Sequence, residues 1–186
     1  MQIRPATAAD LDRLTDIDGT IESARYLHLE RAGEALALTW KLDERPLRQK
    51  LIDPNALDDD RRFTVKQILT GADEGYALVA EHDEVIVAAL VAQPDAVAAR
   101  LRILDIRVDY DFRRQGVGMA MVFQSIQHAR ESELRAVTIE TLTNNLPANE
   151  FLLKCGFDIS GLDTQRHSNH DLVKESATLI WHAALD

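Results

Sequence analysis

A stretch near the middle of the chain, from Leu104 to Ala129, constrains the fold more than any other part of the sequence. Apolar residues alternate at its start, which predicts a strand over residues 103–108. A loop with two glycines follows at residues 113–118, of sequence RRQGVG. Beyond the loop, apolar residues recur at helical spacing, namely Met119, Val122, Phe123, Ile126 and Ala129. The stretch therefore predicts a strand, a glycine loop and an amphipathic helix in direct succession.

This order of elements is suited to holding an anion. The first N–H groups of a helix have no partner within the helix and lie at the positive end of its dipole. Gly116 and Gly118 let the backbone approach a ligand without an intervening side chain. Arg113 and Arg114 can add charge-assisted hydrogen bonds to phosphate oxygens. For the stretch taken alone, an ordinary strand–helix turn with solvated arginines is the alternative interpretation.

The loop fits neither of two common nucleotide-binding signatures. A P-loop places a lysine directly after its second glycine, and no lysine follows Gly118. The dinucleotide-binding fingerprint needs a third glycine where the sequence has Met121. The pattern that the loop does match is R-x-x-G-x-G. It resembles the loop that binds the pyrophosphate of acetyl-CoA in the GNAT family of N-acetyltransferases.

A second motif, within residues 144–157, strengthens this resemblance. The family pattern there is N-x-x-A, an apolar pair and then G-F, and the residues that match it are Asn145, Ala148, Phe151, Gly156 and Phe157. Both motifs occur in the family's order, which is more specific than either motif alone. Residues 144–145, 154–157 and 162–164 also look like the streptothricin acetyltransferase branch of the family.

The resemblance implies an α/β fold, the acyl-CoA N-acyltransferase (GNAT) fold. Helices flank a single mixed, mostly antiparallel sheet in this fold, and the sheet splays open at its central strands. The predicted order of strands and helices agrees with such a layered architecture. With 186 residues, we expect a single domain over residues 1–186 that contains an atypical insertion at about 20–56.

Within the insertion, the alternation of Leu36, Leu38, Trp40 and Leu42 predicts a β-hairpin near residues 24–45. Its turn is expected over residues 31–34, and a helix over 32–41 is the competing interpretation. Further along, Asp58 is expected to cap a helix over 59–69.

The resemblance also implies which residues bind the coenzyme. The backbone of Ile106 and Val108, with Arg107 between them, would pair with the pantetheine arm like an added strand. The pyrophosphate would be held by the loop and helix start, which comprise Arg113, Arg114, Gln115, Gly116, Val117, Gly118 and Met119. Asn145, in the motif that it shares with Ala148, would hydrogen-bond the pantetheine or its thioester end.

An attacking amine must lose a proton, because an ammonium group has no lone pair. Glu140 and Asp105 are the candidate catalytic carboxylates, since both lie on strands expected to flank the reacting carbonyl. The alternatives are an outward-facing strand residue for Glu140 and a structural hydrogen bond for Asp105. Either carboxylate could instead recognise a cationic amine without moving a proton.

Family members commonly protonate the leaving thiolate with a tyrosine, and Leu152 stands at that position here. Cys155 is expected to be a small buried hydrophobic residue and not a covalent nucleophile. Residues 167–171, of sequence HSNHD, lack a strict ligand spacing and predict a polar loop, so we expect no metal.

Composition narrows the class of partner. The net charge of −10 argues against nucleic-acid binding and suits a cationic substrate. No apolar run approaches the roughly 18 residues that a membrane span needs, so no membrane partner is expected. A single cysteine and an N-terminus without a signal-peptide core favour a cytoplasmic location. A monomer or a homodimer is expected.

Together these features predict an acetyl-CoA-dependent N-acetyltransferase that transfers an acetyl group directly, in a ternary complex, to a primary amine. The amine is expected to belong to a small cationic molecule, such as a streptothricin-like antibiotic or a polyamine. A protein N-terminal or lysine acetyltransferase is the alternative within the class. A non-catalytic acyl-CoA-binding module is the alternative outside it.

Overall fold

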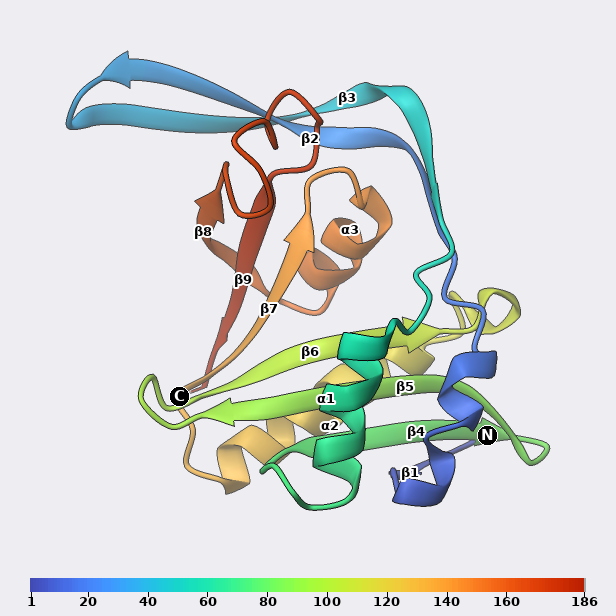
Figure 1. Cartoon of the computed structure of the whole chain (residues 1–186). Helices are drawn as coiled ribbons and strands as arrows, with labels where there is room; N and C mark the ends of the chain where they lie inside the picture. Colours follow the sequence, from blue (N-terminus) through green and yellow to red (C-terminus); the bar gives the residue numbers. More distant parts are fainter. Residues whose placement is uncertain (186) are drawn as a thin grey trace. The chain divides into compact units, whose positions relative to one another are not determined.

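The computed structural model describes residues 1–185 as a seven-stranded mixed sheet, a separate two-stranded ribbon and three α-helices (Figure 1). The strand order in the sheet is β1-β4-β5-β6-β7-β9-β8. This arrangement confirms the predicted α/β fold with its mixed sheet. Asp186, which the predicted single domain includes, lies outside the described residues, and that single domain remains a prediction. Across residues 1–185, no helix is both long and apolar enough to cross a membrane.

The sheet strands are β1 (Gln2–Pro5), β4 (Tyr76–His82), β5 (Val85–Asp95), β6 (Arg100–Val108), β7 (Ala136–Leu142), β8 (Asp158–Asp163) and β9 (Thr178–Ala184). The ribbon strands are β2 (Ile21–Glu34) and β3 (Ala37–Asp53). The helices are α1 (Asp59–Leu69), α2 (Val117–Glu131) and α3 (Leu146–Lys154), with short 3-10 turns η1 (Ala8–Asp10), η2 (Arg13–Asp16) and η3 (Tyr110–Phe112).

The chain divides into two compact units. The first comprises Met1–Thr20, Pro54–Ile139 and the segment from His182. The second comprises Ile21–Asp53 and Glu140–Trp181.

In the first unit, β1, β4, β5 and β6 form antiparallel pairs, whereas β6 pairs with β7 in parallel. The parallel register runs from Arg100 opposite Ala136 to Ile103 opposite Ile139. Strand β6 continues past this register through residues 104–108, where its other side pairs with β5. The parallel register between β6 and β7 therefore ends before β6 does.

Helices cover the two faces of this sheet, α1 in front and α2 behind (Figure 1). Val65 and Ile68 of α1 pack in one apolar cluster with Val79 and Val91 of the strands. Because successive strand side chains point to opposite faces, Leu90 lies on the α2 face. The helix predicted behind Asp58 is confirmed, since that side chain accepts a hydrogen bond from the Arg61 backbone N–H and α1 follows it directly.

The predicted buried face of α2 is wrong in part. Phe123 is half exposed, whereas Met121 and Ser125 are buried. The Ser125 hydroxyl donates to the Val122 carbonyl over 2.7 Å and so needs no water. A pattern drawn from apolar residues alone could not include Ser125, a polar residue whose hydroxyl finds its hydrogen-bond partner within the helix and can therefore be buried.

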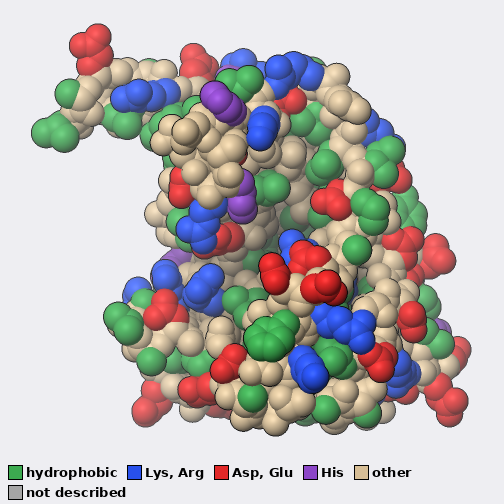
Figure 2. Space-filling view, viewed as in Figure 1, with side chains coloured by type: hydrophobic (Ala, Val, Ile, Leu, Met, Phe, Trp, Pro, Cys, Tyr) green, Lys and Arg blue, Asp and Glu red, His purple; other side chains and the backbone are tan. Residues whose placement is uncertain are grey.

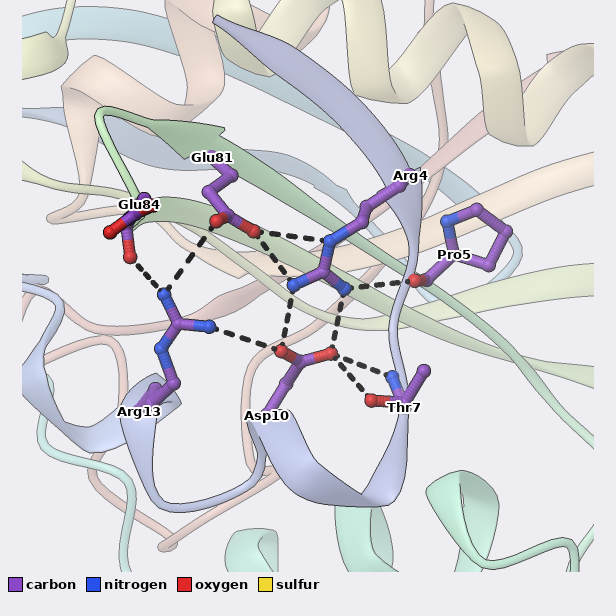
Figure 3. Close-up of polar contacts among 7 residues, drawn as sticks. All are labelled: Arg4, Pro5, Thr7, Asp10, Arg13, Glu81 and Glu84. Atoms are coloured by element: carbon purple, nitrogen blue, oxygen red, sulfur yellow. Dashed lines mark hydrogen bonds and ion pairs between the residues drawn. The ribbon is translucent and has the colours of Figure 1, made fainter.

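The start of the chain is tied to the first unit by a charge network (Figure 3). The Asp10 carboxylate accepts hydrogen bonds from both terminal nitrogens of Arg4, at 2.8 and 2.9 Å. Arg4 also donates to Glu81 of β4 over 2.8 Å. Arg13 completes the network with ion pairs to Asp10 and Glu81 and a hydrogen bond to the Glu84 carbonyl.

In the second unit, the predicted β-hairpin is confirmed but is longer than expected, because it runs from Ile21 to Asp53. The turn lies at Ala35 and Leu36, so the prediction over residues 31–34 is wrong. Gly33 is instead a strand residue at φ 90°, and a Cβ there would lie 1.9 Å from the Ala37 carbonyl oxygen. The glycine marks a close backbone approach beside the turn.

Candidate functional site

Strand β6 contributes a stretch of backbone beyond the parallel register. Ile106 pairs with Leu90 and Val108 with Ala88, both across the β5 side. The side of β6 that faces β7 has its last registered partner at Ile103. Residues 104–108, where the sequence predicts pairing with a pantetheine arm, therefore have no registered β7 partner.

Asp105 and Arg107 lie on the same face of β6 and form an ion pair. The carboxylate accepts two hydrogen bonds from the guanidinium, at 2.7 and 2.8 Å. Arg107 is only 4% exposed and also donates to the Asn55 carbonyl over 3.3 Å. This geometry matches the structural alternative for Asp105, because its charge is already compensated by a buried cation.

Arg113 is turned inward onto the backbone. Its guanidinium donates to the carbonyls of Val108, Thr20 and Asp18 at 3.0, 2.6 and 3.3 Å. It also lies 5.1 Å from the centre of the Tyr110 ring. In this structure Arg113 fixes the loop to the end of β6 and does not point into open space.

The rest of the loop, residues 114–119, offers a ligand backbone N–H groups more than charged side chains. Arg114 and Gln115 are exposed, Arg114 at φ 60°, and the Gln115 amide donates to the Asp111 carbonyl over 3.2 Å. Gly116 is the N-cap of α2 at φ 83°, with open space where a Cβ would lie. Val117 and Gly118 are buried in the first turn, and Met119 is partly buried. The N–H groups of this turn are the ones that an anion can reach.

The second sequence motif begins α3 in the second unit. The Asn145 side chain caps the helix by accepting a hydrogen bond from the Ala148 backbone N–H over 3.3 Å. The asparagine and the alanine of the N-x-x-A motif are therefore joined to each other. The cap uses the Asn145 side-chain oxygen.

Glu140 lies on β7 within the second unit, whereas Asp105 lies in the first. Both carboxylate oxygens of Glu140 accept hydrogen bonds from the same Arg166 nitrogen, at 3.0 and 2.9 Å. The Glu140 side chain is 37% exposed. Both partners of this ion pair are solvent-accessible, so the Glu140 carboxylate remains within reach of a ligand.

A buried polar network that the sequence did not reveal holds α3 to its neighbours. Asn149 is fully buried, and its side-chain oxygen receives hydrogen bonds from the Thr141 hydroxyl at 2.5 Å and the Trp181 indole at 3.3 Å. Its amide donates to the Leu142 carbonyl over 3.0 Å. No periodic pattern could find it, because Thr141, Asn149 and Trp181 lie on three different elements, β7, α3 and β9.

The packing at the end of α3 confirms the prediction that Cys155 is a small buried residue. Leu152 is 1% exposed, so the position expected to hold a tyrosine is an apolar core position here. Cys155 is also buried, and burial raises the pKa of its thiol to about 11. Such a thiol is a poor nucleophile at neutral pH.

A tyrosine on β2 lies in a small pocket of the second unit. The pocket is lined by Tyr26, Leu27, His28, Leu29, Thr143, Leu172, Glu175 and Ala177. The Tyr26 hydroxyl is 2.9 Å from His28 Nδ1, and burial, followed by the nearby Glu175 charge, raises the pKa of the phenol.

Within residues 1–185, no group of three or more His, Cys, Asp or Glu side chains is arranged to hold a metal ion. Residues 167–171 form a loop around Asp171, which accepts hydrogen bonds from the His167 backbone N–H at 2.9 Å and the Ser168 hydroxyl at 2.7 Å. These bonds, the first of them above all, lower the pKa of the Asp171 carboxyl.

The comparison with known protein families matches a region that includes both sequence motifs. The model of the Acetyltransferase (GNAT) family matches residues 35–157. Streptothricin acetyltransferase A of Bacillus subtilis (strain 168) is 35% identical over 80 residues, which are 43% of this chain and 46% of that protein. Streptothricin acetyltransferase of Escherichia coli is 29% identical over 75 residues, 40% of this chain and 43% of that protein. The matches thus span less than half of these curated relatives.

Solved structures resemble the whole chain. The crystal structure of nourseothricin acetyltransferase has a TM-score of 0.78 at 21% identity and covers 100% of this chain and 98% of its own. A Bacillus anthracis str. Ames protein assigned as a streptothricin acetyltransferase, solved in complex with acetyl coenzyme A, has a TM-score of 0.78 at 22% identity. That comparison covers 100% of this chain and 97% of the other. At these identities the likeness shows a shared fold.

Proposed function

The chain belongs to the GNAT family of acetyltransferases, whose model covers residues 35–157, and from this premise we propose that it transfers the acetyl group of acetyl-CoA to a primary amine. One observation carries the proposal. Strand β6 runs past its parallel register and leads, through the loop that Arg113 fixes, into the Gly116 N-cap of α2.

In the proposed complex, the pantetheine arm pairs with the backbone of Ile106 and Val108. The pyrophosphate binds the N–H groups at the start of α2, from Gly116 to Met119. Arg114 is the exposed cation of the loop and adds a charge-assisted contact. Arg113 acts through the loop that it holds in place.

The proposed acceptor is a small cationic amine of the streptothricin class. Two named relatives are streptothricin acetyltransferases, and their matched segments are 35% and 29% identical to this chain. The net charge of −10 attracts a cation, and the exposed carboxylate of Glu140 can receive an ammonium group.

The proposed reaction is direct transfer. The amine loses a proton to Glu140 or to an ordered water and attacks the thioester carbonyl. The new C–N bond forms as the C–S bond breaks, and the electron pair leaves with the coenzyme A sulfur. Leu152 offers no proton, so water protonates the thiolate, which is feasible because a thiol has a pKa of about 8.5.

One pair of measurements tests this function. Calorimetry with acetyl-CoA should show binding, and thiol release should occur with streptothricin and exceed that with a polyamine, a lysine peptide or an N-terminal peptide. Coenzyme binding with no turnover on any acceptor would leave only a binding module. Turnover confined to peptides would favour protein acetylation, and no coenzyme binding would overturn the proposal.

Gly116→Val should weaken coenzyme binding about tenfold, because φ 83° strains a branched residue by roughly 1–2 kcal/mol and distorts the anion-binding turn. The measurement is the calorimetric Kd for acetyl-CoA. Gly71→Val is the matched control, since Gly71 has φ 72° and equally open surroundings but follows α1. Equal affinities for the two variants would count against the loop.

Glu140→Gln should lower kcat and shift its pH profile while leaving coenzyme affinity unchanged. The substitution keeps the shape of the side chain but removes the charge that accepts a proton or receives an ammonium group. Glu150→Gln, an exposed residue on α3, serves as the control. An unaltered pH profile would return Glu140 to a structural role.

A further inference from the structure

Phe123 is an exposed aromatic residue on α2, the helix that the proposed function assigns to the coenzyme. The apolar spacing of α2 predicted that Phe123 would be buried, and it is 50% exposed. A single exposed apolar residue is common on a protein surface. The position of Phe123 on the helix and the chemistry around it therefore have to show whether it meets a ligand.

The stacked rings of Tyr76 and His128 show how α2 is turned on the sheet. They lie 3.9 Å apart and 7° from parallel, so the flank of α2 that carries His128 faces β4. Met119 precedes His128 by about two and a half helical turns and therefore lies on the opposite flank. Helix α2 packs on β5 and β6, and β4 and β7 lie on opposite sides of that pair. The flank of Met119 thus faces the β7 side, and Phe123 follows Met119 by one turn.

The proposed path of the coenzyme lies on the same side. The register of β6 with β7 ends at Ile103, so the backbone of residues 104–108, which the proposed function gives to the pantetheine arm, has no registered partner toward β7. A coenzyme that follows this strand reaches the start of α2 on the β7 side. Phe123 lies about 6 Å further along the helix axis than Met119, the last residue of the proposed pyrophosphate turn. In coenzyme A, a single ribose joins the pyrophosphate to adenine, and it can span such a distance.

The part of α2 around Phe123 carries no charge. Residues 115–127 include no Asp, Glu, Lys or Arg, although 28% of the chain is charged. Helix α1 has acidic residues in its first turn, where they suit the helix dipole, whereas α2 has none there. The start of α2 is therefore left to an anionic ligand. The exposed surface that follows suits an uncharged group such as adenine, since it consists of Ala120, Phe123, Gln124 and Gln127.

We propose that Phe123 stacks on the adenine of acetyl-CoA and makes the protein prefer the whole coenzyme to shorter acetyl-pantetheine thioesters. The inference rests on the proposed function, because it takes the pyrophosphate to bind at the start of α2. Aromatic side chains stack on bases through their π-faces, without a need for polar contacts. The partly buried Met119 provides apolar surface between the Phe123 ring and the phosphate-binding turn.

Calorimetry with two ligands tests the proposal. Phe123→Ala should weaken the binding of acetyl-CoA about tenfold, within the range of base–aromatic stacking. It should leave unchanged the binding of acetyl-phosphopantetheine, which lacks the adenosine. Phe63→Ala is the matched control, because Phe63 is a 63% exposed residue on α1 of the same unit and should alter neither affinity.

Equal losses for the two ligands, or unchanged binding of acetyl-CoA by Phe123→Ala, would overturn the proposal. These outcomes leave the proposed function standing, since wild type still binds the coenzyme in both. Wild type that binds neither ligand would overturn the proposed function and this inference together, so the two failures are distinguished.

Fluorescence gives a second readout that reports on the stacking itself. Phe123→Trp keeps an aromatic face, so it should bind acetyl-CoA as tightly as wild type, and adenine on the indole should quench its emission. The quenching is measured against wild type, in which Trp40 and Trp181 supply the background. Acetyl-phosphopantetheine should cause no quenching, and Phe63→Trp should respond to neither ligand. Emission from Phe123→Trp that acetyl-CoA leaves unchanged on binding would overturn the stacked arrangement.

Discussion

Asp10 shows how one buried carboxylate joins three elements. It lies in η1, and its partner Arg4 on β1 also bonds Glu81 on β4. The Arg4 guanidinium, followed by the Thr7 backbone N–H, holds the pKa of Asp10 far below its usual range. The charged form is thus favoured by folding.

Asp10→Asn should lower the free energy of unfolding by about 3 kcal/mol, because it leaves a partly buried guanidinium short of one anion. Urea unfolding at pH 7 measures the change. Asp12→Asn is the control in the next turn, where the ion pair with Arg62 is exposed and worth less than about 1 kcal/mol. Equal losses for the two variants would contradict a special role for the network.

The Arg4–Asp10 pair also makes the stability of the fold depend on pH. A carboxyl whose pKa is depressed in the folded state stabilises the protein above its unfolded pKa of about 3.9. That stability is lost as the pH falls below this value. Between about pH 4 and pH 2, wild type should therefore lose more stability than Asp10→Asn, and parallel acid curves would contradict the mechanism.

Single residues also show where sequence reasoning ends. Asp58 as a helix cap could be predicted, because the cap and its helix are neighbours in the chain. The partnership of Arg4 with Glu81 could not, because the two are joined only by strand pairing. The inward turn of Arg113 was missed for the same reason, since its acceptors include Thr20.

At the scale of elements, Asn149 connects α3 to β7 and β9 through Thr141, Leu142 and Trp181. These three side-chain contacts of Asn149 fix the turn that carries Asn145. Fully satisfied buried polar networks specify one arrangement of the elements that they join.

Asn149→Ala should destabilise the chain by about 3 kcal/mol, because it leaves the Leu142 carbonyl buried without its donor and opens a cavity. Thermal unfolding measures this loss, and the near-ultraviolet signal of Trp181 should change with it. Asn169→Ala, in an exposed loop, should be nearly neutral. A stable Asn149→Ala chain with an unchanged Trp181 signal would refute the role.

Elements with a strong local signal were predicted best. The helix over residues 59–69 has the predicted limits. The hairpin turn and the buried side of α2 were misplaced, because Gly33 and Ser125 owe their positions to backbone contact and not to periodicity. Strand β8 was not predicted, since its exposed residues show no alternation.

At the scale of the whole molecule, charge is the dominant sequence property. Acidic and basic side chains are interspersed over the face seen in Figure 2, so the excess of −10 is not gathered into one area there. A negative charge that is spread over the surface acts through its long-range electrostatic field. Salt screens this field within about 10 Å at 0.1 M ionic strength.

If the acceptor is cationic, its KM should rise about threefold between low and high salt, because screening removes the attraction that concentrates it. Steady-state assays with streptothricin at constant pH measure the rise. An acceptor amine that carries a single charge is the control and should change less. A KM for streptothricin that does not respond to salt would argue against electrostatic recognition.

The succession of β6, the glycine loop and α2 was predictable, since these elements are contiguous in the sequence. The contact between the β2–β3 ribbon and the segment around Glu175 could not be predicted, because the two meet only through folding. The division of the chain into two units cuts through β7 and β9, and no change in composition marks it.

The early end of the parallel register on β6 has a consequence for the protein without its ligand. A strand whose pairing on one side ends early, as that of β6 with β7 does beyond Ile103, is a template on which a foreign strand can nucleate aggregation. A pantetheine arm bound along this stretch would occupy the same backbone groups. On the proposed function, acetyl-CoA therefore protects the unfinished sheet as well as supplying the group that is transferred.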